Sequence, residues 1–299
     1  MPLCLNRRQE HLFYWKSERK QSLETLEIIM LAALGAAIVT GIIIGAVFRS
    51  NREKNLMVRD LPEEWLRILE RNVALYRFLP EELKKELQGR INIFIDEKEF
   101  EGCGELAITD EIKVTIAANA CILLLNKKLE CYPTLNSVLV YPSAYIARGA
   151  SRLGNQMVQG SENALDGESW EYGNVVLTWD AVKYESRKPG IGSNVVLHEF
   201  AHQLDQANGA SDGIPILHSR EEYERWNTIM EEEFKELCDE AENGIEDVIG
   251  EYGATNRAEF FAVATEAFFS CPKLMQKKHP ALYLELKSFY LLDPAAWNY

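Results

Sequence analysis

The sequence has no cluster of lysine and arginine, no Cys-x-x-Cys pair, no internal repeat and no low-complexity tract. Its formal net charge is −14, whereas a protein that binds nucleic acid needs a basic patch for the phosphates. Nucleic acid is therefore excluded as a partner. The six cysteines show no regular spacing, which argues against a disulfide framework or a zinc ribbon and favours free thiols in a reducing compartment.

A long uncharged run is present once, at residues 28–48, "IIMLAALGAAIVTGIIIGAVF". At about 1.5 Å per residue it spans a hydrocarbon core of about 30 Å, so it predicts a transmembrane helix behind an N-terminal tail, residues 1–27. A cleaved signal peptide has a shorter apolar region, of about 7–15 residues, and a cleavage site. A buried core helix is the third interpretation, and no other segment of the chain is so continuously apolar.

Small residues recur every four positions in this run, at Ala33, Ala37, Gly41 and Gly45. They lie on one helix face and predict a homodimer in the bilayer, although alanine and glycine are common in membrane helices in any case. Lysine and arginine are nearly balanced on the two flanks, so they do not decide the orientation. The unpaired cysteines favour a single-pass protein of the inner (cytoplasmic) membrane whose main domain faces the cytoplasm.

We expect a charged linker at residues 49–60 and one domain at 61–299, with a helical part to about residue 130 and a catalytic core from about 131. Proline followed by two glutamates opens helices at Pro62 and Pro80. Residues 111–125 predict a buried helix, and residues 137–142 and 174–179 predict strands. A capping box at residues 219–222 predicts the start of a long helix that ends near Gly244. The fold class is α+β and mainly helical, with a few strands before the histidines.

Histidine is scarce, yet two of the five histidines, His198 and His202, stand four positions apart around Glu199. On a helix both imidazoles project from one face and can bind one ion at about 2.0–2.1 Å. Glu199 lies beside them and can act as general base on a water held by the ion. The alternative is a pair of hydrogen-bonded core histidines, but burying two on an apolar face is costly without a shared partner. We therefore predict a zinc site.

The residues after the motif restrict the class of metalloprotease. A metzincin would have glycine at position 205 and histidine at 208, where this chain has Asp205 and Asn208, so that class is excluded. Asp205 follows His202 by three positions, and we expect it to orient that imidazole as a hydrogen-bond acceptor rather than to bind the metal.

A third ligand is expected from the apolar helix at residues 256–270, which carries Glu259 and Glu266. These glutamates are seven positions apart and share a face, so spacing favours neither. A carboxylate on so apolar a helix needs a partner, and a dication supplies one. For the glutamate that is not a ligand, an ion pair with Arg257 or Lys273 is the alternative.

Three segments resemble a known family: "GESWEYGNVVLTWD", "HEFAHQLDQANG" and "EYGATNRAEFFAVATEAFFSCP". They are similar to the Mlc titration factor A peptidases, also called glucose-regulated metallopeptidases, which are related in their catalytic core to zinc proteases of the anthrax lethal factor type. The similarity runs from about Leu61 to the C-terminus. Residues 1 to about 55 fall outside it, since the well-known member is soluble.

The resemblance implies a zincin-like domain with an active-site helix, a short mixed sheet and a glutamate helix. It implies that His198, His202 and Glu259 bind Zn²⁺ and that Glu199 is the catalytic base. Tyr252 corresponds to the family's tyrosine and would stabilise the oxyanion. The strand at residues 174–179 would be the sheet edge along which an extended peptide lies.

The sequence thus predicts a membrane-anchored zinc metallopeptidase of the gluzincin type, acting on a peptide or protein substrate. The alternative is a protein-binding regulator that sequesters a transcriptional repressor or another partner, with little or no peptidase activity. A structural zinc domain would close the metal site with cysteine or a further histidine. No such residue stands near the motif.

Overall fold

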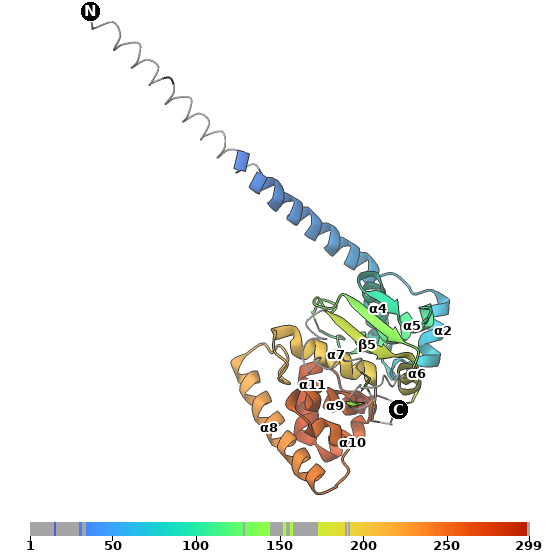
Figure 1. The fold of residues 1–299 in the computed structure, drawn as a ribbon, viewed down its shortest axis with the longest axis vertical. Coiled ribbons are helices and arrows are strands. Elements are labelled where there is room, and N and C mark those ends of the chain that lie inside the picture. The colour runs from blue at the N-terminus through green and yellow to red at the C-terminus, as the bar shows by residue number, and fades with distance from the viewer. Residues whose placement is uncertain are drawn as a thin grey trace, which may run out of the picture. The chain divides into compact units, whose positions relative to one another are not determined.

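The computed structural model describes residues 15, 30–31, 34–127, 129–143, 152–153, 156–157, 173–188, 190 and 192–297. The chain forms two compact units, Met1–Asn55 and Leu56–Tyr299, which are coloured along the chain in Figure 1. Of the expected N-terminal tail and membrane run, residues 1–14, 16–29 and 32–33 lie outside the described residues.

From Leu34 on, the apolar run belongs to a helix, Leu34–Met57, whose length and composition suffice to cross a membrane. This helix extends beyond residue 48, so residues 49–57, expected within the linker, are helical. An i,i+4 ion pair between Arg49 Nε and Glu53 Oε1, 3.0 Å apart, stabilises this extension. Nothing lies within 4 Å of a β-carbon built on Gly41 or Gly45, and Ala33 lies outside the described residues.

The second unit begins with a group of helices: α2 (Glu63–Asn72), α3 (Ala74–Phe78), α4 (Glu81–Glu97) and α5 (Asp110–Ile122). Pro62 and Pro80 directly precede α2 and α4, as predicted, and acidic residues occupy both first turns, where they complement the helix dipole. Helix α5 packs against α2 and α4 and is buried over nearly its whole length. The predicted division of this unit near residue 130 stays a prediction.

The sheet has three strands in the order β1-β2-β5: β1 (Glu99–Gly102), β2 (Ser137–Tyr141) and β5 (Asn174–Thr178). Both predicted strands are therefore confirmed. We expected a mixed sheet, but these strands are all parallel, because each pair is joined by a long crossover rather than a tight turn. A separate antiparallel pair is formed by β3 (Arg152–Leu153) and β4 (Gln156–Met157).

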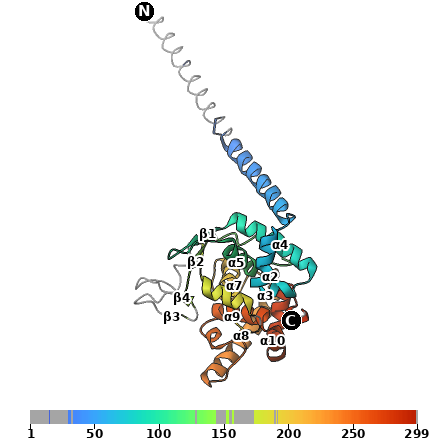
Figure 2. The ribbon, with the colours of Figure 1, turned by 90° about the vertical axis from the view of Figure 1, so that its right-hand side faces the viewer.

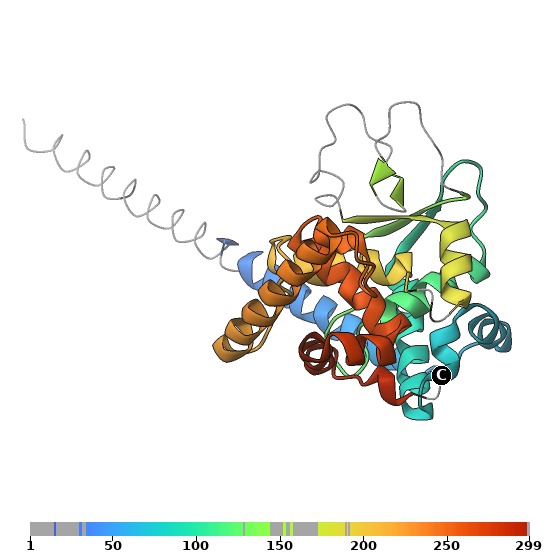
Figure 3. The same ribbon diagram turned by 90° about the horizontal axis from the view of Figure 1, so that it is seen from below.

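The C-terminal part is helical and contains α6 (Trp179–Arg187), α7 (Val195–Asp205), η1 (Gln206–Asn208), α8 (Arg220–Glu242), η2 (Glu251–Ala254), α9 (Arg257–Ser270), α10 (Pro272–Lys278), α11 (Pro280–Tyr290) and η3 (Pro294–Ala296). Figures 1 and 2 show α7 between the sheet and helices α8 to α11, and α8 runs along the periphery of these helices (Figure 3). Helix α9 is the buried centre of this group, since nearly all of its side chains are buried.

Helix α8 begins and ends as its sequence predicts. Ser219 Oγ accepts a hydrogen bond from Glu222 N, 3.2 Å away, and Gly244 adopts a positive φ of 69° just after the helix. In the predicted capping box Glu222 would bind Ser219 N, but its carboxylate accepts from His218 N instead, at 2.8 Å. The helix therefore has the expected N-cap, but the Glu222 carboxylate binds the backbone N–H one residue before Ser219.

A buried ionic cluster fastens the loop after α8 to α10 and α11. His279 lies between two carboxylates, with Nδ1 2.7 Å from Glu233 Oε2 and Nε2 2.9 Å from Asp247 Oδ1. Lys278 Nζ donates to the other oxygen of Asp247 at 2.9 Å. Burial alone would lower the pKa of His279, but the two carboxylates outweigh burial and raise it above its usual value.

We predict that His279→Gln destabilises the metal-free protein most at mildly acidic pH. A histidine whose folded pKa is raised contributes stability below its unfolded pKa of about 6.5 and loses it as pH rises through the folded pKa. Near pH 5.5 the loss should be about 1.5–3 kcal/mol, the range for hydrogen bonds to charged groups, and near pH 9 it should shrink. Urea unfolding near pH 5.5 and near pH 9, with a chelator present, measures the loss of stability. His218→Gln at an exposed position is the control. An equal loss at the two pH values would contradict the prediction.

Candidate metal centre

Helix α7 carries the histidine motif, and all eleven of its residues are buried. It begins after Asn194, whose side chain accepts from Val196 N at 3.1 Å and from Leu197 N at 3.2 Å. Apolar neighbours on both sides of the motif pack into the core and fix the rotation of the helix. As a result His198 and His202 face α9, the helix that packs most closely against α7.

Three side chains from these two helices converge on one point. Nε2 of His198 lies 3.1 Å from Glu259 Oε2, and Nε2 of His202 lies 3.5 Å from the same oxygen. The two imidazole nitrogens are 3.2 Å apart. His198, His202 and Glu259 could hold a metal ion, since one ligand atom from each lies within 4.8 Å of the others. The structure thus brings together the three residues that the family pattern names as ligands.

The cluster is short of positive charge, which fits a bound cation. Burial alone would raise the pKa of Glu259, but the two imidazoles outweigh burial and hold it well below its usual range. Burial would lower the pKa of His198, yet Glu259 and Glu266 raise it well above its usual value. In the metal-free protein, a proton on His198 supplies the positive charge that these carboxylates need. A bound metal ion would supply this charge instead, because a histidine must lose that proton to bind a metal.

One buried carboxylate oxygen at this point, Glu199 Oε1, has no hydrogen-bond partner among the described residues, and Glu259 Oε2 lies close to the two imidazoles without a well-aligned hydrogen bond to either. Orphaned buried acceptors are costly unless an ion or a water completes them. Burial raises the pKa of Glu199 to about 8, with Glu259 and Glu266 adding to the effect and His198 opposing it. A group with such a pKa can exchange protons near neutral pH, as a general base must.

Glu266, the other glutamate of α9, has a different place. Its Oε1 lies 2.8 Å from His198 Nδ1, on the side of the ring away from Glu259. The two glutamates thus face different nitrogens of one imidazole, a distinction that spacing alone did not make. Arg257, considered as an ion-pair partner for one of them, pairs instead with Glu231 on α8.

Asp205 is placed differently from our expectation. Its Oδ2 accepts from Gly213 N at 3.0 Å, and its Oδ1 is buried with no hydrogen-bond partner among the described residues. Burial raises the pKa of Asp205 to about 6. Asp205 is the last residue of α7, so its side chain binds the loop that leaves the helix rather than the imidazole one turn earlier. The expectation that it is the acceptor for His202 is therefore wrong.

Tyr252 lies on η2, next to the motif. Its ring centroid is 6.0 Å from that of His198, with the ring planes inclined by 38°. Helix η2 packs against α8 and α9, and Gly253 lies so close to the side chains of Leu237, Ile249 and Val263 that a β-carbon there would be tightly packed. Tyr252 is therefore held beside His198, one of the candidate metal ligands.

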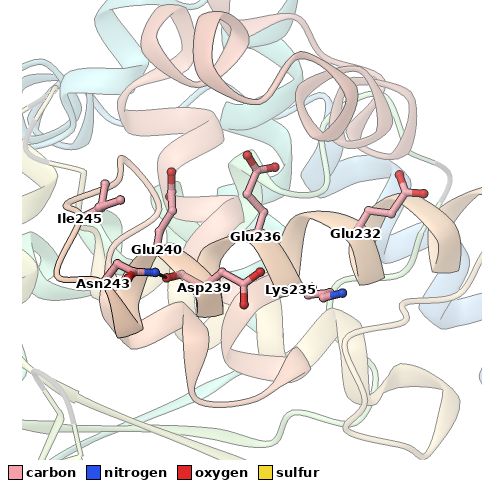
Figure 4. A pocket seen from close by; sticks show the side chains of 7 residues that line it. All are labelled: Glu232, Lys235, Glu236, Asp239, Glu240, Asn243 and Ile245. Carbon is pink, nitrogen blue, oxygen red and sulfur yellow. Dashed lines mark hydrogen bonds between the residues drawn. The ribbon is translucent and has the colours of Figure 1, made fainter.

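A shallow hollow on α8 is separate from this centre. Figure 4 shows side chains spaced along α8 together with two that follow the helix, Asn243 and Ile245. The lining residues are Glu232, Lys235, Glu236, Asp239, Glu240, Asn243 and Ile245. None of them belongs to the metal centre, and their acidity is that of a solvated helix face.

We predict that Gly213→Ala is much more destabilising than Gly209→Ala, although both glycines have positive φ, 77° and 89°. A β-carbon on Gly213 would clash with the Arg257 carbonyl at the start of α9, whereas open space surrounds Gly209. The expected losses are about 2–4 kcal/mol and about 1 kcal/mol. Urea unfolding measures both, and similar losses would show that this loop does not brace the start of α9.

Comparison with known proteins confirms the resemblance seen in the sequence. A family model described as glucose-regulated metallo-peptidase M90 matches residues 48–291. An uncharacterized protein of Synechocystis is 39% identical over 244 residues, which cover 81% of this chain and 89% of that protein. Mlc titration factor A of Serratia proteamaculans is 33% identical over 199 residues, covering 64% and 73%. That of Yersinia pestis is 29% identical over 228 residues, covering 75% and 83%. This chain belongs to the family of glucose-regulated metallo-peptidases, M90.

Proposed function

We propose that this protein is a zinc-dependent peptidase in which His198, His202 and Glu259 bind the metal and Glu199 is the general base. The observation that carries the proposal is the convergence of two imidazole nitrogens and one carboxylate oxygen within 3.5 Å of one another. Membership of a metallo-peptidase family supports it.

The donor set favours zinc in a catalytic rather than a structural site. Two histidines and one glutamate are a common catalytic zinc set that leaves a fourth position open, whereas structural sites are closed by cysteine or more histidine. When bound, zinc supplies Lewis-acid polarisation of a carbonyl and lowers the pKa of water. The cysteines that the structure describes are not part of the cluster.

The chain's own residues then divide the work of peptide hydrolysis. Glu199, with its unpartnered Oε1, takes a proton from the attacking water and passes it to the leaving amine. A nearby dication would lower the pKa of Glu199 from its metal-free value. Tyr252, beside His198, donates a hydrogen bond to the oxyanion that develops on the scissile carbonyl.

The substrate we propose is an extended stretch of polypeptide. Strand β5 is one of the two outer strands of the three-stranded sheet among the described residues, and it packs against α7. An outer strand offers unpaired backbone groups, to which a peptide can add as a further strand. A peptide aligned in this way would lie beside the helix that carries the metal ligands.

A protein-binding role is the second candidate. Relatives that are 29% and 33% identical to this chain bear the name Mlc titration factor A, and this name supports a regulator that sequesters a protein partner. Binding of this kind would need neither Glu199 nor Tyr252, so variants of these residues distinguish the two candidates.

We further propose that the helix Leu34–Met57 anchors the protein in a membrane with the domain on the cytoplasmic side. Its composition supports the anchor, and the free thiols support the placement. The test is membrane fractionation with alkaline carbonate and a pair of C-terminal fusions. A protein retained in the membrane with a fluorescent GFP fusion and an inactive alkaline phosphatase fusion is expected. An active alkaline phosphatase fusion would contradict the placement.

For the enzyme, we predict that Glu199→Gln still binds one zinc ion per chain but hydrolyses a peptide library about 10²–10⁴-fold more slowly, because only the base is lost. Metal analysis and single-turnover hydrolysis by the full-length protein in mild detergent measure both quantities. Tyr252→Phe should also retain zinc and lose about 10²-fold in rate.

The matched control is Glu236→Gln on the exposed face of α8, which removes the same charge outside the metal centre and should hydrolyse like the wild type. A wild type without zinc, or a Glu199→Gln variant as fast as the wild type, would refute the enzyme. Zinc binding without hydrolysis by the wild type would favour the regulator.

A further inference from the structure

The first turn of α7 is held entirely by side chains. A helix begins with backbone N–H groups that have no partner within the helix. Here Asn194 N donates to Glu266 Oε2, and Val195 N donates to Glu185 Oε2 at 2.6 Å. The next two N–H groups donate to Asn194 Oδ1. The acceptors come from α6, α9 and the N-cap itself, so the start of the motif helix is fixed by its neighbours.

The N-cap side chain is itself held by a further buried amide. Nδ2 of Asn194 donates to Asn119 Oδ1 on α5 at 3.0 Å, and Nδ2 of Asn119 donates to Ser186 Oγ on α6, also at 3.0 Å. All these side chains are buried. We call Ser186, Asn119, Asn194 and Glu266 the polar ladder. Its members come from elements that surround the N-terminal end of α7 (Figure 1).

The polar ladder ends at Glu266, which contacts the imidazole of His198. Glu266 binds the N-cap backbone through Oε2 and His198 Nδ1 through Oε1. An Nδ1–H that donates to a carboxylate fixes the ring orientation and directs the other nitrogen, Nε2, to the metal. Any displacement of Asn194 therefore moves both the helix that carries the histidines and the carboxylate that orients one of them.

We propose that the polar ladder sets the affinity of the metal centre, and that Asn119 and Ser186 are positioning residues for His198. Asn119 touches none of the proposed ligands, from which it is separated by three hydrogen bonds, through Asn194 and Glu266. The proposal rests on the proposed function, since it presupposes that His198 binds zinc. It extends the functional site to two helices, α5 and α6, that carry no ligand.

The competing explanation is that these buried amides contribute only to general stability. Loss of a buried hydrogen bond destabilises a protein wherever it lies, so a stability measurement alone cannot separate the two. Zinc affinity can, because a purely structural contact leaves the folded site as it was. Thr265 supplies a matched control: it lies next to Glu266 on α9, and its buried hydroxyl bonds Tyr290 Oη at 2.8 Å, outside the polar ladder.

The experiment measures the zinc dissociation constant of the full-length protein in mild detergent, by competition with a chromophoric chelator, and the unfolding midpoint of the metal-free form. Glu266→Gln should weaken zinc binding about 10–100-fold, as for other partners of metal-bound histidines. Asn119→Leu should weaken it about 10-fold, and Ser186→Ala by a smaller factor. Thr265→Val should bind zinc within about twofold of the wild type despite a lower midpoint.

Weaker binding in this order, with the control unchanged, supports the proposal. Wild-type affinity in both Asn119→Leu and Ser186→Ala overturns it, as does equal weakening in Thr265→Val. If Asn119→Leu does not fold, the milder variant Ser186→Ala is compared with Thr265→Val instead, and that comparison decides. A wild type that binds no zinc refutes the proposed function itself, whereas a zinc-binding wild type with insensitive ladder variants refutes this inference alone.

Discussion

The arrangement of the second unit depends on the burial of ionisable groups in an apolar core. Helix α7 is buried along its whole length, yet it carries two imidazoles and two carboxylates, those of Glu199 and Asp205. Such groups are costly in a low-dielectric interior unless partners surround them. Two carboxylates from α9 therefore flank one imidazole, and this requirement fixes the distance, rotation and register of α9 against α7.

The same requirement explains why the polar groups concentrate at helix ends. The starts of α7 and α9 are capped by Asn194 and Asn256, and the latter binds the backbone N–H of Glu259 itself, at 3.0 Å. A glutamate in a capped first turn has a fixed backbone and lies where the helix dipole favours negative charge. The Glu259 carboxylate at the candidate metal centre is thus held by local structure as well as by the imidazoles.

The sequence predicted the parts of the site that follow from helix periodicity and left open those that depend on long-range packing. The spacing of His198 and His202 placed both rings on one face, and the apolar residues around them predicted a buried helix. Periodicity could not choose between Glu259 and Glu266, because residues seven apart share a face. Their roles differ only through the crossing of α7 over α9, which spacing does not encode.

Other parts of the structure were outside the reach of local patterns. Asp205 has the spacing of a residue that faces His202, but the helix ends there and Gly213 N binds its side chain. The three strands of the sheet pair in parallel although they lie far apart in sequence. Their order therefore depends on the crossover segments between them. In the sequence, Asn119 is a polar residue within an apolar segment of its helix. Its hydrogen bonds to Ser186 and Asn194 form only when the neighbouring helices are in place.

The seven-residue spacing of the two glutamates on α9 has a consequence for how this chain can vary. Because they approach opposite edges of one imidazole, a shift of α9 along its axis or about it moves both contacts at once. Inserting a single residue between them would turn one carboxylate by about 100° from the other, so that the ring would lose a partner on one side. Length changes are consequently restricted to the loops that join α9 to its neighbours, and the segment between the glutamates can change only by substitution.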